Sequence, residues 1–189
     1  MRPENVDDRW SDIYDQGRDF TLATSHEISK FLGFAHPALP KTALDIGCGT
    51  GQLTRELYHR GYKTVGIDAS TSAIQIACSL TVVPPEQLSY VRIDIERDQP
   101  GKLPHAPYGL ITCKLVYAFI EDKPAFLKRV KQLLAPEGLF VVVTPLPEHV
   151  PPEKIKIAAS ADDVALLSSS FDVVAQYDER GLTYFLGTM

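Results

Sequence analysis

Apolar and polar positions follow two alternating periods from residue 42 onward. Short apolar runs, typical of buried strands, are separated by segments of about ten residues in which apolar positions recur three or four apart, as in a helix. The strands are predicted at residues 43–46, 64–67, 90–95, 108–113 and 139–143, and the helices at 52–60, 70–80 and from 122 onward. Strands that alternate with helices in this way predict βαβ units and a parallel sheet with right-handed crossovers.

The end of the chain departs from this alternation. A short helix around residues 162–167 precedes two strands, 171–174 and 182–186, with Glu179-Arg180-Gly181 between them. Two strands joined by so short a connection are antiparallel. The predicted fold class is therefore α/β, with a mostly parallel sheet and a C-terminal antiparallel hairpin.

The first forty residues form a separate section, which is predicted to be helical and amphipathic. Trp10 and Tyr14 recur at helical spacing, and Leu22, Ile28 and Phe31 follow less regularly. A glycine and a proline-rich stretch end the section before residue 41. A chain of 189 residues suits one domain overall. We therefore divide it into an N-terminal helical segment, residues 1–40, and a domain at residues 41–189.

Composition narrows the function classes. The formal net charge of −5 gives no global basic field that would recruit nucleic acid or anionic lipid. No apolar run approaches the roughly 20 residues that span a bilayer, and the N-terminus lacks an apolar signal segment, which predicts a cytoplasmic protein. Three scattered cysteines predict neither a disulfide framework nor a metal site. We expect a monomer or homodimer that acts on a small molecule, without nucleic-acid or membrane partners.

A glycine-rich turn follows the first predicted strand. Asp45-Ile-Gly47-Cys-Gly49-Thr-Gly51 leads directly into a helix, so the backbone can approach a ligand closely beside unpaired N–H groups. The second strand ends at Asp68, where a carboxylate can accept both hydroxyls of a ribose. Together these features indicate an adenosine-containing ligand at the carboxyl ends of the strands.

The spacing of the glycines favours one such ligand over another. A dinucleotide fingerprint is G-x-G-x-x-G, but here the third glycine comes one residue early and position 52 is Gln. Asp45 lies two residues before the first glycine and would repel a pyrophosphate. An ammonium and a sulfonium would instead be attracted, and S-adenosylmethionine carries both.

Three segments carry a resemblance to a known family. Residues 44–51, 65–70 and 133–139 resemble the first two motifs and the turn before the fifth strand of the class I S-adenosylmethionine-dependent methyltransferases, with Glu137 where a glycine is common. The resemblance covers about residues 40–189. It implies a Rossmann-like, seven-stranded, mostly parallel sheet with helices on both faces. It also implies S-adenosylmethionine as cofactor and S-adenosylhomocysteine as product.

The resemblance assigns roles to individual residues. The cofactor is expected to contact the side chains or backbone of Tyr14, Arg18, Asp45, Gly47, Gly49, Gly51, Asp68, Ala69, Asp94, Ile95, Lys114 and Leu115. Residues 1–40 would act as a lid, although ordinary packing of an amphipathic helix also explains its aromatic pair. A strand-end acid in water is the alternative for Asp94, and a solvated side chain is the alternative for Arg18.

The expected reaction is methyl transfer to an oxygen or nitrogen of a small metabolite. Candidate catalytic residues are Lys114, Tyr117 and His149, although positioning alone can supply much of the rate. For Lys114 the alternatives are backbone support or binding of an acidic substrate. Candidate substrate-binding residues are Trp10, Tyr14, His26, Tyr117 and His149.

Other functions remain open at this point. A nicotinamide-dependent oxidoreductase would use the same glycine turn for a dinucleotide. A non-catalytic partner subunit would bind the cofactor without turnover. A third alternative keeps the cofactor but cyclises it or transfers a different group.

Overall fold

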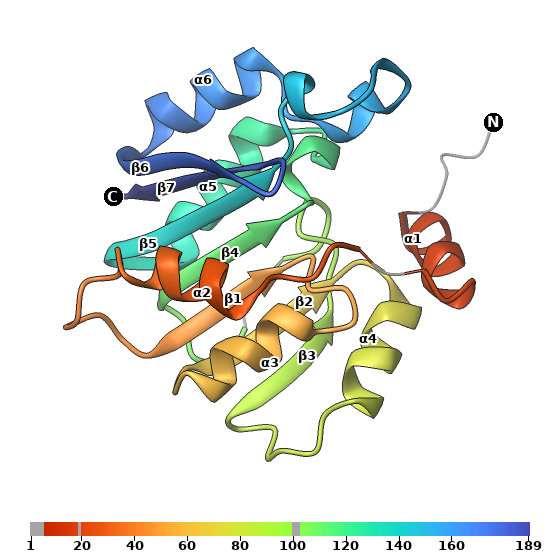
Figure 1. The fold of residues 1–189 in the computed structure, drawn as a ribbon. Coiled ribbons are helices and arrows are strands. Elements are labelled where there is room, and N and C mark those ends of the chain that lie inside the picture. Colours follow the sequence, from red (N-terminus) through yellow and green to blue (C-terminus); the bar gives the residue numbers. More distant parts are fainter. Residues whose placement is uncertain (1–5, 19, 100–102) are drawn as a thin grey trace.

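A seven-stranded sheet forms the centre of the structure, a computed structural model that describes residues 6–18, 20–99 and 103–189 (Figure 1). The strand order is β3-β2-β1-β4-β5-β7-β6. The first five strands are parallel, whereas β7 is antiparallel to both β5 and β6. The strands are β1 Thr42–Ile46, β2 Lys63–Asp68, β3 Leu88–Arg92, β4 Tyr108–Lys114, β5 Leu134–Thr144, β6 Asp172–Glu179 and β7 Leu182–Thr188. The predicted Rossmann-like sheet and its terminal hairpin are confirmed.

Helices connect the strands and cover the sheet. The α-helices are α1 Val6–Asp15, α2 Ser25–Leu32, α3 Gln52–His59, α4 Thr71–Ser79, α5 Lys123–Leu133 and α6 Ala161–Ser170. Three short 3₁₀ helices are η1 Tyr117–Phe119, η2 Pro147–His149 and η3 Pro152–Ile157. Polar side chains start several of the helices: the Ser70 hydroxyl accepts from the N–H of Ala73, and Asp122 accepts from that of Ala125.

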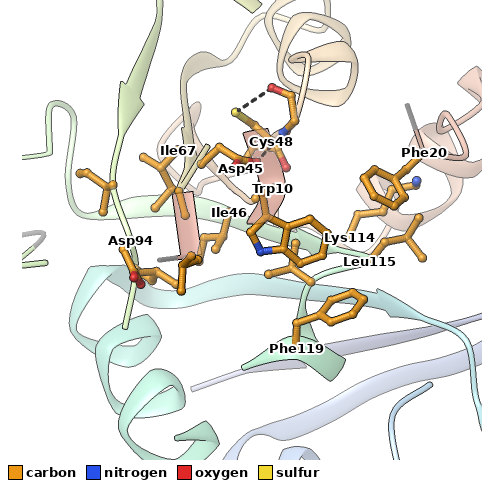
Figure 2. A pocket seen from close by; sticks show the side chains of 18 of the residues that line it. Trp10, Phe20, Asp45, Ile46, Cys48, Ile67, Asp94, Lys114, Leu115 and Phe119 are labelled. Atoms are coloured by element: carbon orange, nitrogen blue, oxygen red, sulfur yellow. Dashed lines mark hydrogen bonds between the residues drawn. The ribbon is translucent and has the colours of Figure 1, made fainter. Parts of the chain in front are cut away.

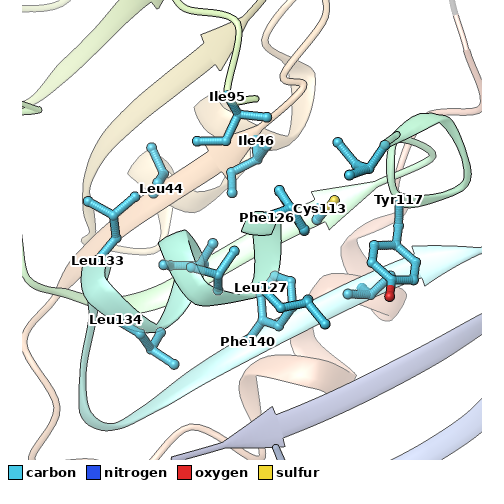
Figure 3. Close-up of a cluster of buried hydrophobic side chains, with 14 of the residues drawn as sticks. Leu44, Ile46, Ile95, Cys113, Tyr117, Phe126, Leu127, Leu133, Leu134 and Phe140 are labelled. Atoms are coloured by element: carbon cyan, nitrogen blue, oxygen red, sulfur yellow. The ribbon is translucent and has the colours of Figure 1, made fainter. Parts of the chain in front are cut away.

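The buried side chains divide into two clusters, one on each face of the sheet. On one face α5 packs Phe126, Leu127 and Leu133 against Leu44 and Phe140 (Figure 3). On the other face the helices α2 and α3 cover β1, β4, β5 and β7. The strand β5 contributes alternate residues to the two clusters, as expected for a strand buried on both sides.

Several predicted boundaries were wrong. The strand predicted at 171–174 continues to Glu179, so β6 spans Asp172–Glu179. The strand predicted at 90–95 spans Leu88–Arg92, because the carboxylate of Asp94 accepts from the N–H of Glu96 and turns the chain. Ile93 and Ile95 keep the apolar alternation since they still pack against the core. The last parallel strand begins at Leu134, five residues early, and continues through an irregularity opposite β4. Leu22 lies outside a helix, because the capping box of Thr24 starts α2 only at Ser25.

The strand order reverses its direction of growth between β1 and β4. In open α/β sheets this switch point leaves a crevice at the carboxyl ends of the strands. Helix α1 lies at this edge, beside α4 (Figure 1). No helix in the described ranges combines the length and apolar character that crossing a membrane requires.

Candidate functional site

A pocket opens at the carboxyl ends of β1, β2 and β4 (Figure 2). Its floor is the glycine turn after β1 and the ends of β2 and β4. Residues 93–96 form one wall, and residues 114–116 and 119–121 form another. Helix α1 and residues 20–22 cover it. Residues of the N-terminal segment therefore line this pocket. Residues 1–5 and 19 of that segment lie outside the described part of the chain.

The glycine turn is held in a conformation that few side chains tolerate. Gly47, Gly49 and Gly51 have φ of 67°, 53° and 79°. The backbone N–H groups of Gly47 and Cys48 donate to the carbonyl of Ile67 over 2.8 and 3.0 Å. Gly47 and Gly49 line the pocket, but Gly51 instead packs behind the turn, where a Cβ would lie 2.4 Å from the hydroxyl of Tyr90. The structure therefore gives Gly51 a packing role, and not the expected cofactor contact.

The carboxylate of Asp68 joins this turn to the next helix. Its two oxygens accept from the backbone N–H groups of Gly49 and Ser70, each over 2.9 Å. Burial raises the pKa of Asp68, although these hydrogen bonds oppose the shift. The side chain is 8% exposed and lines the pocket. It is a fixed acceptor at the position where the sequence predicts a ribose.

Asp45 is the second buried carboxylate of the pocket. The hydroxyls of Thr54 and Thr112 donate to its two oxygens over 2.7 and 2.8 Å. Burial nevertheless raises the pKa of Asp45 to about 6, because the charged form has lost its water. A charge that is this costly to bury is typical of a binding site for a cationic group.

Replacing Asp45 by asparagine should stabilise the empty protein at pH 7. The unfolded carboxyl ionises near 3.8 and the folded one near 6, so the free energy of unfolding falls as pH rises through this window. The variant has no carboxyl at this position and does not lose this stability. Its free energy of unfolding at pH 7 should therefore be about 1–3 kcal/mol higher than that of the parent protein. Urea unfolding at pH 4 and pH 7 measures the difference, and an equal pH dependence in both proteins contradicts it.

The adenine side of the predicted site is also assembled. Ala69, Asp94 and Ile95 line the pocket beside Asp68. The chain beyond Asp94 is fixed because Glu96 accepts from the backbone N–H groups of Glu121 and Asp122 over 2.9 and 2.8 Å. Asp94 lies across the pocket from Lys114 and Leu115, with Trp10 between them (Figure 2).

Two side chains of the domain hold the covering segment in place. The ammonium of Lys114, at the end of β4, donates to the carbonyl of Thr21. The side-chain amide of Gln52 accepts from the N–H of Ala23 and donates to its carbonyl over 3.1 and 3.0 Å. Lys114 therefore gives the backbone support that was one of its predicted alternatives. We call residues 21–23 the strap.

Helix α1 covers the pocket with aromatic side chains. Trp10 packs edge to face against Phe119 and Phe20, with ring centroids 4.9 and 6.2 Å apart. The hydroxyl of Tyr14 lies against the glycine turn, 2.7 Å from where a Cβ at Gly49 would stand. Trp10 and Tyr14 therefore line the pocket, where the family resemblance placed them.

Polar side chains of α1 reach the N-terminus of α4. Asp7 accepts from the backbone N–H and the hydroxyl of Thr71 over 2.8 and 2.7 Å. The hydroxyls of Ser11 and Ser70 lie 3.0 Å apart. Burial raises the pKa of Asp7, but the hydrogen bonds from Thr71 outweigh it and bring the pKa below the usual value. An ionised Asp7 thus holds α1 against the start of α4, near Asp68. We call the contact between Asp7 and Thr71 the latch.

Besides Gly51, four predicted site residues lie outside the pocket. Arg18 is exposed and His26 lies 3.7 Å from Glu179, so neither reaches the pocket. Tyr117 is fully buried, and its hydroxyl donates to the carbonyl of Asp163 over 3.2 Å. Burial also raises the pKa of Tyr117 far above its usual range, which makes it a poor base.

His149 faces the hairpin, where its ring lies 3.7 Å from Asp178. No described residue of the segment after β5 lines the pocket. His26, Tyr117 and His149, the three predicted substrate-binding residues discussed above, are not among the residues that line this pocket.

Several residues that line the pocket were not predicted as site residues from the sequence. Phe20, Leu22 and Phe119 come from segments without a regular period, so no pattern singled them out. Cys48 and Gln52 lie within the glycine turn or directly after it. Their sequence position was a usable signal, because residues inside a ligand-binding turn face the ligand or the cover.

A sequence profile described as a methyltransferase domain matches residues 18–183. Curated relatives named ubiquinone biosynthesis O-methyltransferase are similar to part of this chain. The protein of Rickettsia canadensis is 28% identical over 101 residues, which are 53% of this chain and 41% of the relative. That of Yersinia enterocolitica is 24% identical over 135 residues, 71% of this chain and 55% of the relative. The chain thus spans about half the length of these relatives.

A solved structure shares the fold. The S-adenosylmethionine-dependent methyltransferase from Mesorhizobium loti superposes with a TM-score of 0.69 at 17% identity. The match covers 87% of this chain and 98% of that protein. Identity at this level supports the arrangement of strands and helices alone.

Proposed function

Because this chain belongs to the methyltransferase-domain family, whose cofactor is S-adenosylmethionine, we propose that it transfers a methyl group from that cofactor to an oxygen or nitrogen of a small molecule. The observation that carries the proposal is the pair of buried carboxylates Asp45 and Asp68 on either side of the glycine turn. One is suited to an ammonium and the other to ribose hydroxyls. A dinucleotide would bring its pyrophosphate against Asp45 and be repelled.

The residues present fit the cofactor. Glycine at positions 47 and 49 lets Val116 and the hydroxyl of Tyr14 lie against the turn, so the turn, Val116 and Tyr14 together border the pocket. Asp45 holds the ammonium, Asp68 accepts from the ribose, and Asp94 with Ile95 borders the adenine. Tyr14 closes the site from above, against Gly49. Each of these assignments is supported by position and burial on the pocket wall.

When bound, the sulfonium supplies the methyl group: a lone pair of the acceptor forms the new bond to the methyl carbon, and the electron pair of the broken carbon–sulfur bond stays on sulfur. The protein contributes positioning, which can supply much of the rate. The strap and α1 exclude water and restrict the approach of the acceptor. Lys114 holds the strap, and no described residue is required as a base when the nucleophile arrives deprotonated.

The experiment is calorimetric titration with S-adenosylhomocysteine, with NADH as the control. We expect micromolar binding of the first compound and none of the second. The same protein is then incubated with S-adenosylmethionine carrying a labelled methyl group and a panel of small alcohols, phenols and amines. Binding of NADH alone would overturn the proposal. Binding without turnover on any acceptor would favour a non-catalytic partner subunit, and methylthioadenosine as product would indicate cyclisation.

Loss of the latch at Asp7 should speed release of the product. In Asp7→Asn the side chain is a weaker acceptor for the N–H and hydroxyl of Thr71, so α1 opens more often, and the dissociation rate of S-adenosylhomocysteine should rise roughly tenfold. Trp10 is the only tryptophan of the sequence, so its fluorescence in a stopped-flow chase reports the release. Asp8→Asn, on the same helix and exposed, is the matched control. Equal rates in the three proteins would refute the latch.

A further inference from the structure

The mouth of the pocket is aromatic, and its rings come from three separate segments. Trp10 belongs to α1, Phe20 precedes the strap, and Phe119 belongs to η1. Phe20 and the neighbouring Leu22 are 40% and 53% exposed, unusual for large apolar side chains in a covering segment. Phe20 lies beside Lys114 and Leu115, on the side away from Asp94 (Figure 2). Since Asp94 borders the adenine in the proposed function, these rings face the acceptor.

Charges divide along the same line. The carboxylates that line the pocket are Asp45, Asp68, Asp94, Glu96 and Glu121. Asp45 and Asp68 flank the glycine turn, and Glu121 is tied through its N–H to Glu96, next to Asp94. They therefore lie along the expected cofactor.

The cations among the described lining residues are Arg9, which lies with the aromatic rings, and Lys114, which lies near Phe20 and also close enough to Asp45 for its charge to oppose the rise in the pKa of that carboxyl. The guanidinium of Arg9 stands 5.2 Å from the ring centroid of Trp10 and 5.9 Å from that of Phe119. Lys114 ends β4 next to Phe20 in the pocket (Figure 2). A neutral or cationic acceptor gains nothing from this pair, whereas an anion is attracted by both charges.

We propose that the methyl acceptor is a small aromatic acid, whose ring packs among Trp10, Phe20 and Phe119 and whose carboxylate faces Lys114 and Arg9. This inference rests on the proposed function, because that function assigns the Asp94 side of the pocket to the cofactor and so leaves the aromatic side for the acceptor. A planar ring fits edge-to-face contacts better than an aliphatic chain does. The positive charges discriminate between an acid and its neutral isostere.

The test is a calorimetric comparison on protein saturated with S-adenosylhomocysteine. The probes are 4-hydroxybenzoate, its neutral amide 4-hydroxybenzamide, the cation 4-hydroxybenzylamine and the non-aromatic anion cyclohexanecarboxylate. We expect 4-hydroxybenzoate to bind at least tenfold more tightly than each of the other three. Equal binding of the amide, or of cyclohexanecarboxylate, overturns the proposal, and so does binding of none of the four.

Variants locate the preference. Lys114→Gln keeps an N–H donor for the strap but removes the charge, so the ratio of acid to amide affinity should fall several-fold while the affinity for the amide is kept. Lys63→Gln, an exposed lysine at the start of β2, is the control. Equal weakening of acid and amide would indicate a structural role only. Weaker binding of S-adenosylhomocysteine with an unchanged ratio would assign the charge to the methionine carboxylate. Either result overturns the proposal.

The two levels of inference fail separately. If S-adenosylhomocysteine binds but the aromatic acid has no advantage, the acceptor class is wrong and the methyltransferase assignment stands. If S-adenosylhomocysteine does not bind at all, the proposed function fails first and the acceptor class with it.

Discussion

Replacing Gly47 by alanine is expected to lower the affinity for S-adenosylhomocysteine by at least roughly 100-fold. The residue has a φ of 67°, which costs an L-residue about 1–2 kcal/mol. Its new Cβ would stand 2.1 Å from a methyl carbon of Val116, far inside contact distance. The turn must therefore move, and it would carry the pocket floor away from the cofactor. Calorimetric titration measures the affinity, and thermal unfolding measures the accompanying loss of stability.

Gly61→Ala separates strain from displacement. Gly61 has a φ of 83°, but nothing lies within 4 Å of the position that a Cβ would take. It follows α3 at the end away from the pocket. This control should lose about 1 kcal/mol of stability and keep its cofactor affinity. Adding Val116→Ala to Gly47→Ala should recover part of the affinity, since the methyl group in the way is removed. Full affinity in Gly47→Ala alone would contradict the proposed floor of the site.

Asp68→Ala should weaken binding of S-adenosylhomocysteine by about 1–3 kcal/mol, roughly 5–150-fold. The ribose hydroxyls lose their acceptor, and the N–H groups of Gly49 and Ser70 lose theirs. Asp68→Asn keeps an acceptor oxygen and removes the charge, so it should bind with intermediate affinity. Burial raises the pKa of Asp68, so loss of the charge alone should not destabilise the empty fold.

The control for Asp68 is Asp172→Asn, at the exposed start of the edge strand β6. It should bind S-adenosylhomocysteine like the parent protein. Urea unfolding of every variant distinguishes a lost contact from a lost fold. Parent-like affinity in a folded Asp68→Ala would show that the ribose lies elsewhere in the pocket.

Local patterns were sufficient for most of the framework. The apolar runs of β1, β2, β4 and β5 predicted buried strands, because short apolar runs bounded by turns are typical of strands that are covered on both faces. The hairpin was equally determined: Arg180 and Gly181 both adopt positive φ, at 53° and 74°, as a two-residue turn between antiparallel strands requires. The glycine turn and Asp68 were predictable for the same reason, since both sit where a strand ends.

Patterns were insufficient where a side chain's direction depends on distant neighbours. Tyr117 follows β4 by three residues, like a pocket residue, but packing against α5 turns its ring into the core. Neighbouring Phe119 faces the pocket instead. Ile93 and Ile95, the last of the alternating apolar residues, pack against the core as predicted, but the strand ends before them. The pattern indicated burial and not strand pairing, because apolar side chains pack as well from a turn as from a strand.

The sequence by itself determined the sheet, the turn at Gly47 and the carboxylates that suit a cofactor. These follow from backbone pairing, positive φ and strand ends, which are local properties. Only the tertiary structure decided which side chains cover the pocket. Lys114 and Gln52 reach the strap from more than twenty positions away along the chain, and Asp7 reaches α4 in the same way. Such contacts join residues that only the folded chain brings together, so local sequence patterns do not predict them.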